Sequence, residues 1–363
     1  GNTYQAKVGQ NYSYDSYNAN GPSGKLYDVQ EYNYRVNFGA LFNWALNFGE
    51  GQRIEFKNLL DQVSTNRTNR MEGWNNYRMG YFNYDMLGYT LRTTYSGQFS
   101  GFHPIGPDRR TKIDWNAGFS YANKREPDRR IYGMKRDEES GRFTYLIPST
   151  PSVNEFGRLW LRNKENLTAG AINVTHLFDG DRVKPTLKAG LYGEYKTRDY
   201  SERSFGYRST NRGLTAEELS QYPLEELFSD TYFGRDKSFY LEEQTNPANF
   251  YDAKNIQGAA YVALDLEIGA FDLYFGVRGE YNRLELNGYY DANTPVEVDD
   301  PRFNLFPSVN MSYKAGERSL LRLAYGRTVN RPEFREVSPL QYYDFSELAT
   351  YKGNPELKEA LID

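Results

Sequence analysis

The amino-acid sequence predicts an all-β protein, a transmembrane antiparallel up-and-down β-barrel with long loops at one end of its strands. Three observations lead to this prediction. One strand alternates apolar and polar side chains over a length that suits a bilayer. No apolar run is long enough for a membrane helix, and short connections alternate with long ones along the chain.

The stretch RVNFGALFNWALNFGEG at residues 35–51 provides the first observation. Its alternate apolar residues are Val36, Phe38, Ala40, Phe42, Trp44, Leu46 and Phe48. A period of two puts successive side chains on opposite faces of a strand. About twelve rises of roughly 3.3 Å give about 40 Å, and a tilt of about 45° projects this to about 28 Å, close to the apolar band of about 25 Å on an outer-membrane barrel. We therefore expect the apolar face to contact lipid.

The composition permits a barrel in spite of a low mean hydropathy of -0.80 over 363 residues, because every second residue of a barrel strand can be polar. A membrane helix needs about 18 or more consecutive apolar residues, and the sequence has no such run. The chain has 33 Tyr, 22 Phe and 4 Trp residues, a composition that suits the aromatic girdles at the two edges of a membrane. A Tyr-rich carbohydrate-binding surface is the alternative.

Charge and cysteine content exclude further classes. The net charge is -4, from 44 basic and 48 acidic residues without a basic block, so we expect no nucleic acid partner. The absence of Cys excludes a disulfide framework and a thiolate metal site. The sequence starts at Gly1 without a charged and apolar leader, so we expect any signal peptide to lie outside it.

Strand patterns recur along the whole chain, and a partial strand is expected near Thr3 to Val8. The predicted strands cover residues 27–48, 53–63, 77–100, 111–123, 166–178, 184–202, 256–268, 271–286, 303–314 and 318–330. Three of them repeat a clear apolar alternation, from Ile113 to Tyr121, from Ile256 to Ile268 and from Phe271 to Tyr281. We therefore expect ten or eleven strands.

The connections between these strands alternate in length. Short, turn-like ones lie at Gly49–Gln52, His103–Arg110, Asp179–Val183, Gly269–Ala270 and Ala315–Glu317. Long ones lie at 64–76, 124–165, 203–255, 287–302 and from 331 onward. Such alternation is typical of a meander that crosses a membrane, with tight periplasmic turns and long extracellular loops. Within the 203–255 loop, Thr215 and Glu218 form a predicted capping box ahead of a helix that Pro223 interrupts.

No residue pattern in the chain predicts an enzyme, a cofactor or a metal site. The two histidines, His103 and His176, lack a partner at the spacing of a hydrolytic triad. The acidic loop with Asp291, Glu297, Asp299 and Asp300 lacks the spacing of a calcium loop, and we expect it to be solvated.

Two further features are candidates for ligand or lipid contact. The basic stretch KREPDRR at 124–130 suits anionic lipid headgroups or an anionic ligand, although a charged mobile loop is the simpler interpretation. Aromatic side chains in the loops either stack on a ligand or pack the loops against one another. The candidates for ligand contact are Tyr222, Phe228, Tyr232, Phe233, Tyr342 and Tyr343.

The end of the chain, LRLAYGRTVNRPEFREVSPLQYYDFSELATYKGNPELKEALID, resembles the barrel segment of TonB-dependent outer-membrane receptors. The matching residues are Thr328, Asn330, Arg331, Pro332, Glu333, Phe334, Tyr342, Tyr343, Asp344, Phe345, Gly353, Asn354, Pro355 and Leu357. The residues also have a physical interpretation. Pro332 has no backbone N–H to donate to a neighbouring strand, so it ends strand pairing. Gly353 to Pro355 form a predicted turn, which the resemblance places in an outer loop.

The resemblance implies a barrel of 22 strands in the outer membrane of a Gram-negative bacterium, with an N-terminal plug in its lumen. It also implies active uptake of a nutrient, either a small molecule or an oligomer, driven through TonB. We find neither a plug domain nor a TonB box in residues 1–363, so we expect this chain to be about half of the barrel wall. Its expected partners are lipid, the plug, the remaining strands, and TonB through an N-terminal region outside this sequence. The alternatives are a passive porin-like channel and a secreted all-β carbohydrate-binding protein.

Overall fold

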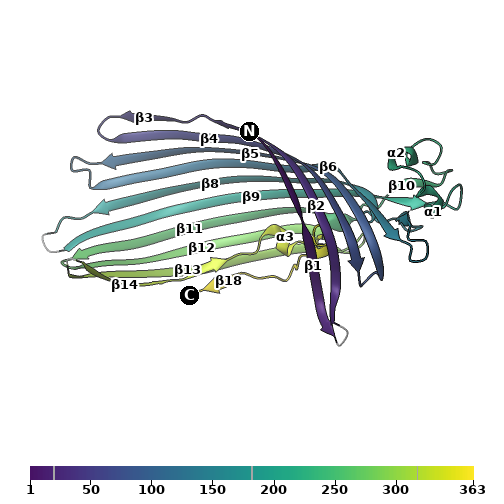
Figure 1. Cartoon of the computed structure of the whole chain (residues 1–363). Helices are drawn as coiled ribbons and strands as arrows, with labels where there is room; N and C mark the ends of the chain where they lie inside the picture. Colours follow the sequence, from purple (N-terminus) through teal and green to yellow (C-terminus); the bar gives the residue numbers. More distant parts are fainter. Residues whose placement is uncertain (19–20, 181–182, 317) are drawn as a thin grey trace.

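In the computed structural model, which describes residues 1–18, 21–180, 183–316 and 318–363, the chain forms one long antiparallel sheet that curves into an open trough (Figure 1). The main path of the sheet runs through β1 (Asn2–Asn18), β2 (Gly21–Leu41), β4 (Gln52–Asn75), β5 (Gly80–Ile105), β6 (Thr111–Arg136), β8 (Phe156–Leu177), β9 (Val183–Ser209), β11 (Phe250–Ile268), β12 (Phe271–Tyr289), β13 (Pro295–Gly316) and β14 (Ser319–Gly326). Three short strands extend it, namely β3 (Trp44–Phe48), β7 (Phe143–Tyr145) and β10 (Phe239–Glu243).

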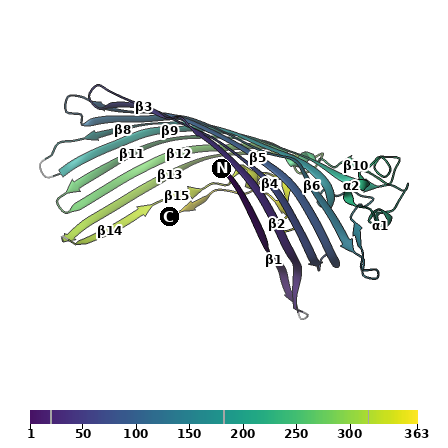
Figure 2. The same ribbon diagram turned by 45° about the horizontal axis from the view of Figure 1, so that its top comes forward.

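Each strand of the main path pairs with the strands that precede and follow it in this path, and all these pairs are antiparallel. The up-and-down arrangement and the predicted number of ten or eleven strands are therefore confirmed within the described residues. The first and last strands, β1 and β14, are the two edges of the sheet, and their described residues do not pair with each other. The barrel is thus partial, and Figure 2 shows its open side.

The register places the predicted apolar sets on one common face. Val262 of β11 pairs with Val277 of β12, and Leu264 pairs with Phe275, which in turn pairs with Val309 of β13. Directly paired residues point to the same side of a sheet. These side chains remain solvent-exposed, Val262 at 47% and Phe275 at 43%. We call this apolar convex side the outer face, and the opposite, concave side the inner face.

The opening strand follows the same rule, with one interruption. The structure splits the predicted strand 27–48 into β2 and β3 at Phe42 and Asn43, although the register against β4 is the same on both sides of the break. The side chain of Asn43 accepts a hydrogen bond from the backbone N–H of Asn58 (2.9 Å), and the side chain of Asn58 donates to the carbonyl of Phe42. Side-chain amides here replace part of the backbone ladder.

Four of the long connections are shorter than we predicted, because the strands continue past the apolar band. The predicted loop 64–76 is mostly strand, up to Asn75, and the other three shrink to 137–155, 210–249 and 290–294. Pairing continues there between polar side chains, as between Arg70 and Asp85 (2.8 Å) or Arg283 and Asp299 (2.8 Å). The alternation of apolar side chains stops where contact with lipid is expected to stop. The backbone hydrogen bonds between the strands continue, because they do not depend on apolar side chains.

The basic stretch at 124–130 is likewise part of a strand, which corrects its interpretation as a mobile loop. It lies in β6 and contains a β-bulge, since residues 126–129 hold one residue more than the facing segments of β5 and β8. Asp128 adopts a left-handed conformation with φ of 60°, which Asp tolerates better than most residues. The bulge shifts the alternation of side chains by one residue, and the basic stretch has side chains on both the outer and the inner face.

The connection between β9 and β11 is an ordered subdomain. It holds α1 (Ala216–Leu219), α2 (Leu224–Leu227), β10 and the short 3₁₀ helix η1 (Pro247–Asn249). The predicted capping box is present, because Glu218 N–H donates to Thr215 Oγ1 (3.3 Å) and Thr215 N–H donates to Glu218 (2.8 Å). Pro223 separates the two helices, as predicted. In the described ranges, no helix has both the length and the apolar character needed to cross a membrane.

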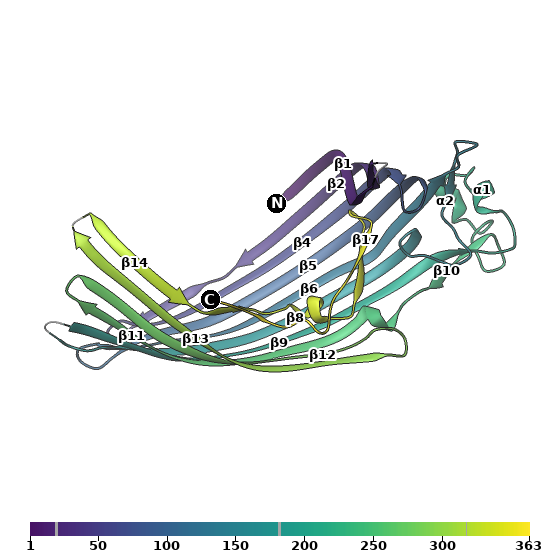
Figure 3. The ribbon, with the colours of Figure 1, turned by 90° about the horizontal axis from the view of Figure 1, so that it is seen from below.

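Residues 327–363, which we call the C-terminal segment, leave the sheet and turn onto the inner face (Figure 3). The predicted strand 318–330 is therefore too long, since β14 ends at Gly326. The segment contains β15 (Thr328–Asn330), α3 (Phe334–Val337), β16 (Gln341–Asp344), β17 (Ala349–Lys352) and β18 (Ala360–Ile362). Within it β15 pairs with β18 and β16 pairs with β17. The expected outer loop thus folds back into the trough.

Candidate functional site

The inner face is polar because it takes the alternate residues of strands whose other face is apolar. One row across it contains Tyr192 of β9, Ala259 of β11, Glu280 of β12 and Asn304 of β13, which are paired in register. The neighbouring row contains Glu194, Gln257, Asn282 and Arg302. Buried carboxylates and amides need partners, and the C-terminal segment supplies several of them.

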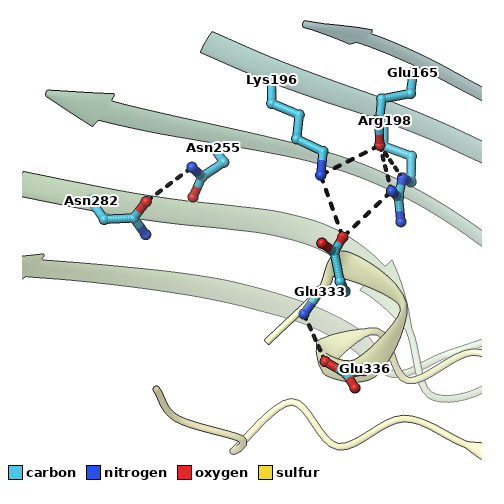
Figure 4. A network of polar contacts seen from close by, with 7 residues as sticks. All are labelled: Glu165, Lys196, Arg198, Asn255, Asn282, Glu333 and Glu336. Atoms are coloured by element: carbon cyan, nitrogen blue, oxygen red, sulfur yellow. Dashed lines mark hydrogen bonds and ion pairs between the residues drawn. The ribbon is translucent and has the colours of Figure 1, made fainter. Parts of the chain in front are cut away.

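Two cations of β9 hold the start of α3 (Figure 4). Glu333 lies 3.4 Å from Lys196 Nζ and 3.6 Å from Arg198. Arg198 also donates to Glu165 of β8 (2.8 Å), which lies 3.7 Å from Lys196. The ring of Phe334 lies 5.3 Å from Lys196 Nζ and 5.2 Å from the guanidinium of Arg198. Two cations, two carboxylates and an aromatic face therefore form one mixed cluster.

Arg331 makes a second anchor on β12. It donates to Glu280 (2.8 Å), a carboxylate that is only 8% exposed and that also accepts from Arg278 (2.5 Å) and Gln257 (3.1 Å). Arg331 lies 3.7 Å from Glu359 at the other end of the segment. The residues of the sequence motif and the strand wall thus share one charge network.

Apolar packing completes this anchor. Phe334, Val337 and Leu340 are buried against the inner face, in a cluster that includes Tyr251 and Leu286. Residues of the second half of the motif close over the helix, since Asn354 N–H donates to the carbonyl of Glu336 (2.6 Å). A Cβ at Gly353 would overlap the carbonyl oxygen of Ser338, so the backbone approaches too closely there for any side chain.

The hairpin of β16 and β17 carries the segment across the trough to the first strands. Phe345 is buried in a second cluster with residues of β2, β4, β5 and β6, where its ring meets Tyr84 edge-on at 6.4 Å. Tyr342 stacks on Tyr351 at 5.2 Å, and the guanidinium of Arg335 lies 3.4 Å from the Tyr342 ring centroid. The C-terminal segment therefore bridges β9–β12 and β2–β6.

Beside this hairpin is a cavity of about 780 Å³ on the inner face of β2, β4, β5 and β6. Its charged lining consists of Arg35, Asp61, Arg67, Arg92, Lys124, Glu126, Arg129 and Asp344. Lys124 lies 2.5 Å from Glu126, and the Nε of Arg129 is buried without a hydrogen-bond partner. Tyr343 also lines the cavity, and burial raises the pKa of its phenol, which stays neutral and able to donate. The cavity has an excess of cationic side chains and a polar aromatic edge.

The four aromatic candidates of the 203–255 region lie elsewhere. Phe228 and Phe233 pack around Phe239 at 5.9 Å and 5.5 Å, and Tyr222 lies 5.0 Å from Tyr232. All belong to the subdomain between β9 and β11, while Tyr342 and Tyr343 lie in the C-terminal segment. The structure thus divides the six candidate ligand-contact residues between two places.

Several of the remaining polar candidates have structural partners. His103, which lies in β5 and not in a turn, accepts from Trp115 Nε1 (3.0 Å) and contacts Gln52 (2.7 Å). His176 contacts Thr111 (2.8 Å). The predicted acidic loop is mostly strand, because Glu297, Asp299 and Asp300 lie in β13. There Asp299 is bound by Arg283, and Asp300 lies 2.7 Å from Arg302.

Sequence reasoning overlooked the cationic side chains of the inner face, above all Arg35, Arg67 and Arg92. A signal was present for Arg35, which lies among the polar residues that alternate with the apolar side of the predicted strand 27–48, whereas Arg67 fell in a predicted loop. Their convergence with the C-terminal segment was not readable, since it depends on how that segment folds back.

Comparison with known protein families gives a match in the second half of the chain. Residues 221–363 match the outer membrane protein beta-barrel family, and this region includes the whole C-terminal segment. No curated protein matches the chain significantly. The fold and this match together indicate an outer-membrane protein.

The chain also has a distant similarity to solved structures, three of which follow. The siderophore receptor PiuA from Acinetobacter baumannii is 10% identical, over 97% of this chain and 49% of that chain, with a TM-score of 0.45. The ferric citrate transporter FecA in its unliganded form is 10% identical, over 90% of this chain and 44% of that chain, with a TM-score of 0.43. The ferric-catecholate import receptor Fiu from K12 E. coli is 12% identical, over 88% of this chain and 51% of that chain, with a TM-score of 0.41. The chain thus spans about half the length of these structures.

Proposed function

We propose that this chain forms part of the wall and outer loops of a TonB-dependent receptor for active nutrient uptake. One observation carries the proposal. The C-terminal motif that resembles such receptors docks on the inner face, where Arg331 reaches Glu280 (2.8 Å) and Glu333 lies 3.4 Å from Lys196. A nutrient that crosses a barrel must pass along this face.

The docked segment favours a receptor over a passive channel. An open pore needs a lumen wide enough for water and solutes. Here the C-terminal segment extends across the trough from the cluster around Phe334 to the cluster around Phe345, so it narrows the path. A path that must open for each passage suits transport that consumes energy. We therefore propose a transporter without catalytic residues.

Ligand contact is proposed on the side of the long connections, which we assign to the extracellular space. Tyr342 and Tyr343 lie on the hairpin beside the cavity, and Tyr343 lines it. The aromatic subdomain between β9 and β11 projects at the same end of the strands (Figure 1) and supplies Tyr222, Phe228, Tyr232 and Phe233. The mainly cationic lining of the cavity suits an anionic group on the ligand.

The proposal assigns residues 1–363 to the barrel and requires partners that complete it. In lipid each unpaired backbone group costs several kcal/mol, so the free edges of β1 and β14 need further strands. A plug in the lumen and TonB contact through a region before the barrel are the other proposed partners.

Uptake measurements in living cells test the proposal. We would delete the gene, and separately inactivate the energy-coupling protein, and follow uptake of labelled iron chelates, vitamins, glycans and peptides. A receptor of this kind predicts that one labelled class is lost in both strains. Uptake that persists without energy coupling, together with solute conduction in liposomes, would support the porin-like channel. Extraction of the protein without detergent would support the secreted carbohydrate-binding protein.

A further inference from the structure

Two arginines lie directly opposite each other on the outer face. Arg125 of β6 pairs in register with Arg162 of β8, and both side chains are exposed. Arg125 also pairs with Leu91 of β5, and Arg162 pairs with Ser201 of β9, so no acidic residue flanks the pair within its row. In the described ranges, neither arginine has an ion pair or hydrogen bond through its side chain.

Two of the carboxylates of β6 are engaged or point to the other face. Asp128, in the bulge of β6, binds Arg130 (2.5 Å) and Arg158 (2.6 Å). Glu126 lines the cavity on the inner face and lies 2.5 Å from Lys124. The basic stretch is therefore divided between the two faces, and Arg125 is left outward without compensation.

The next row toward the membrane adds a third cation. Lys164 of β8 pairs with Asn123 of β6 and with Asp199 of β9, and Asp199 in turn pairs with Asp252 of β11. Lys164 Nζ lies 6.0 Å from the ring of Tyr121. Asp199 and Asp252 balance the charge on the β9 side of this row, so the unbalanced positive charge is centred on the two arginines.

Like charges at directly opposed positions of an antiparallel pair destabilise it. The chain nonetheless places two guanidinium groups there, about 5 Å apart at Cα, where uncharged residues would pair without repulsion. An anion bound between them removes the repulsion. Guanidinium groups bind phosphate oxygens in a bidentate manner, which makes phosphate the best-matched anion.

The depth of the pair matches lipid headgroups. The apolar alternation of β6 ends at Tyr121, which pairs with Asn166, and the arginines follow two rows later. Four residues span about 13 Å along a strand, or about 9 Å along the membrane normal at a tilt of about 45°. Tyrosine rings mark the edge of the hydrocarbon, and the headgroup region begins there.

We infer that Arg125 and Arg162, assisted by Lys164, bind the phosphate of an anionic lipid in the leaflet on the side of the long connections. The inference rests on the lipid contact of the outer face, and it does not depend on the uptake ligand. A failed uptake experiment would therefore leave it standing.

Lipid binding to the complete protein that contains this chain tests the site. The protein is purified in a zwitterionic detergent and titrated with dioleoylphosphatidylglycerol or dioleoylphosphatidylcholine, and bound lipid is counted by native mass spectrometry. We expect Arg125→Gln with Arg162→Gln to weaken phosphatidylglycerol binding about tenfold and to leave phosphatidylcholine binding unchanged. The matched control is Arg203→Gln with Arg208→Gln, because these exposed arginines are paired with Glu243 (3.0 Å) and Glu242 (3.1 Å). We expect the control to stay within twofold of wild type.

Heat stability separates binding from a structural role. Without anionic lipid, the double substitution of the opposed pair should leave the unfolding temperature unchanged or raise it, because repulsion is removed. With phosphatidylglycerol, wild type should gain stability and this variant should not. Equal gains in both, or equal weakening by the control variant, would overturn the site. Displacement of the lipid by inorganic phosphate at the same concentration would assign the pair to a free anion and would overturn the lipid assignment.

Discussion

Replacement of Arg331 by Met tests whether the charge network holds the C-terminal segment on the inner face. The substitution keeps much of the side-chain volume but removes the hydrogen bond to Glu280 (2.8 Å) and the ion pair with Glu359 (3.7 Å). A hydrogen bond to a charged group contributes about 1.5 to 3 kcal/mol. The full penalty for an orphaned buried charge does not apply, because Glu280 keeps Arg278 and Gln257.

A second effect lowers the expected loss. The buried Nε of Arg331 has no hydrogen-bond partner, so its removal recovers part of a desolvation cost. We expect a net loss of about 1 to 2 kcal/mol in the free energy that keeps the segment docked, which is a factor of about 5 to 30 in its open population.

Native-state hydrogen exchange of the complete protein measures this population directly. Amides of residues 334–340 should exchange about 5 to 30 times faster in Arg331→Met, while those of β12 stay unchanged. Lys358→Met is the control, since it removes one exposed positive charge from the same segment. Equal acceleration in both variants, or none in Arg331→Met, would refute the role of the Glu280 contact.

Three further predictions concern the fold and its orientation. Gly353→Ala should destabilise the docked segment by about 1 to 3 kcal/mol, because a Cβ there overlaps backbone atoms of the α3 turn. Proteolysis between β17 and β18 should then become faster, and an unchanged cleavage rate would contradict the close approach. Val262→Arg should cost about 2 to 4 kcal/mol in lipid vesicles, and Ala259→Arg on the inner face much less; equal losses in an unfolding titration would reverse the assignment of the two faces. An epitope tag in the connection between β9 and β11 should bind antibody on intact cells and a tag at Gly269 should not; the opposite labelling would invert the topology.

The strands and their two faces were predictable from the sequence because they depend on local alternation. The pattern around Val262 and Phe275 decides which side of a strand is apolar, whatever its neighbours are, and the structure places these residues on one face in register. The turn at Gly269–Ala270 and the capping box at Thr215 were readable for the same reason, since both depend on residues within one turn.

Strand ends and the bulge were not predictable. From Asn123 to Arg130 the side chains of β6, apart from Pro127, are polar on both faces, and the strand continues there because β5 and β8 offer backbone partners. The basic stretch therefore looked like a loop. Its division into outward Arg125 and inward Lys124 follows from pairing with residues some 30 to 40 positions away, such as Leu91 and Asn163.

By itself the sequence determined the class of fold, the apolar and polar faces of the strands and the motif at the end of the chain. Only the tertiary structure decided where that motif lies. Arg331 meets Glu280 and Phe345 meets Tyr84 because the C-terminal segment turns back across the trough. The first pair of residues is 51 positions apart in the sequence and the second pair is 261 positions apart. Their energies depend on burial and partner geometry, which exist only after the sheet has formed.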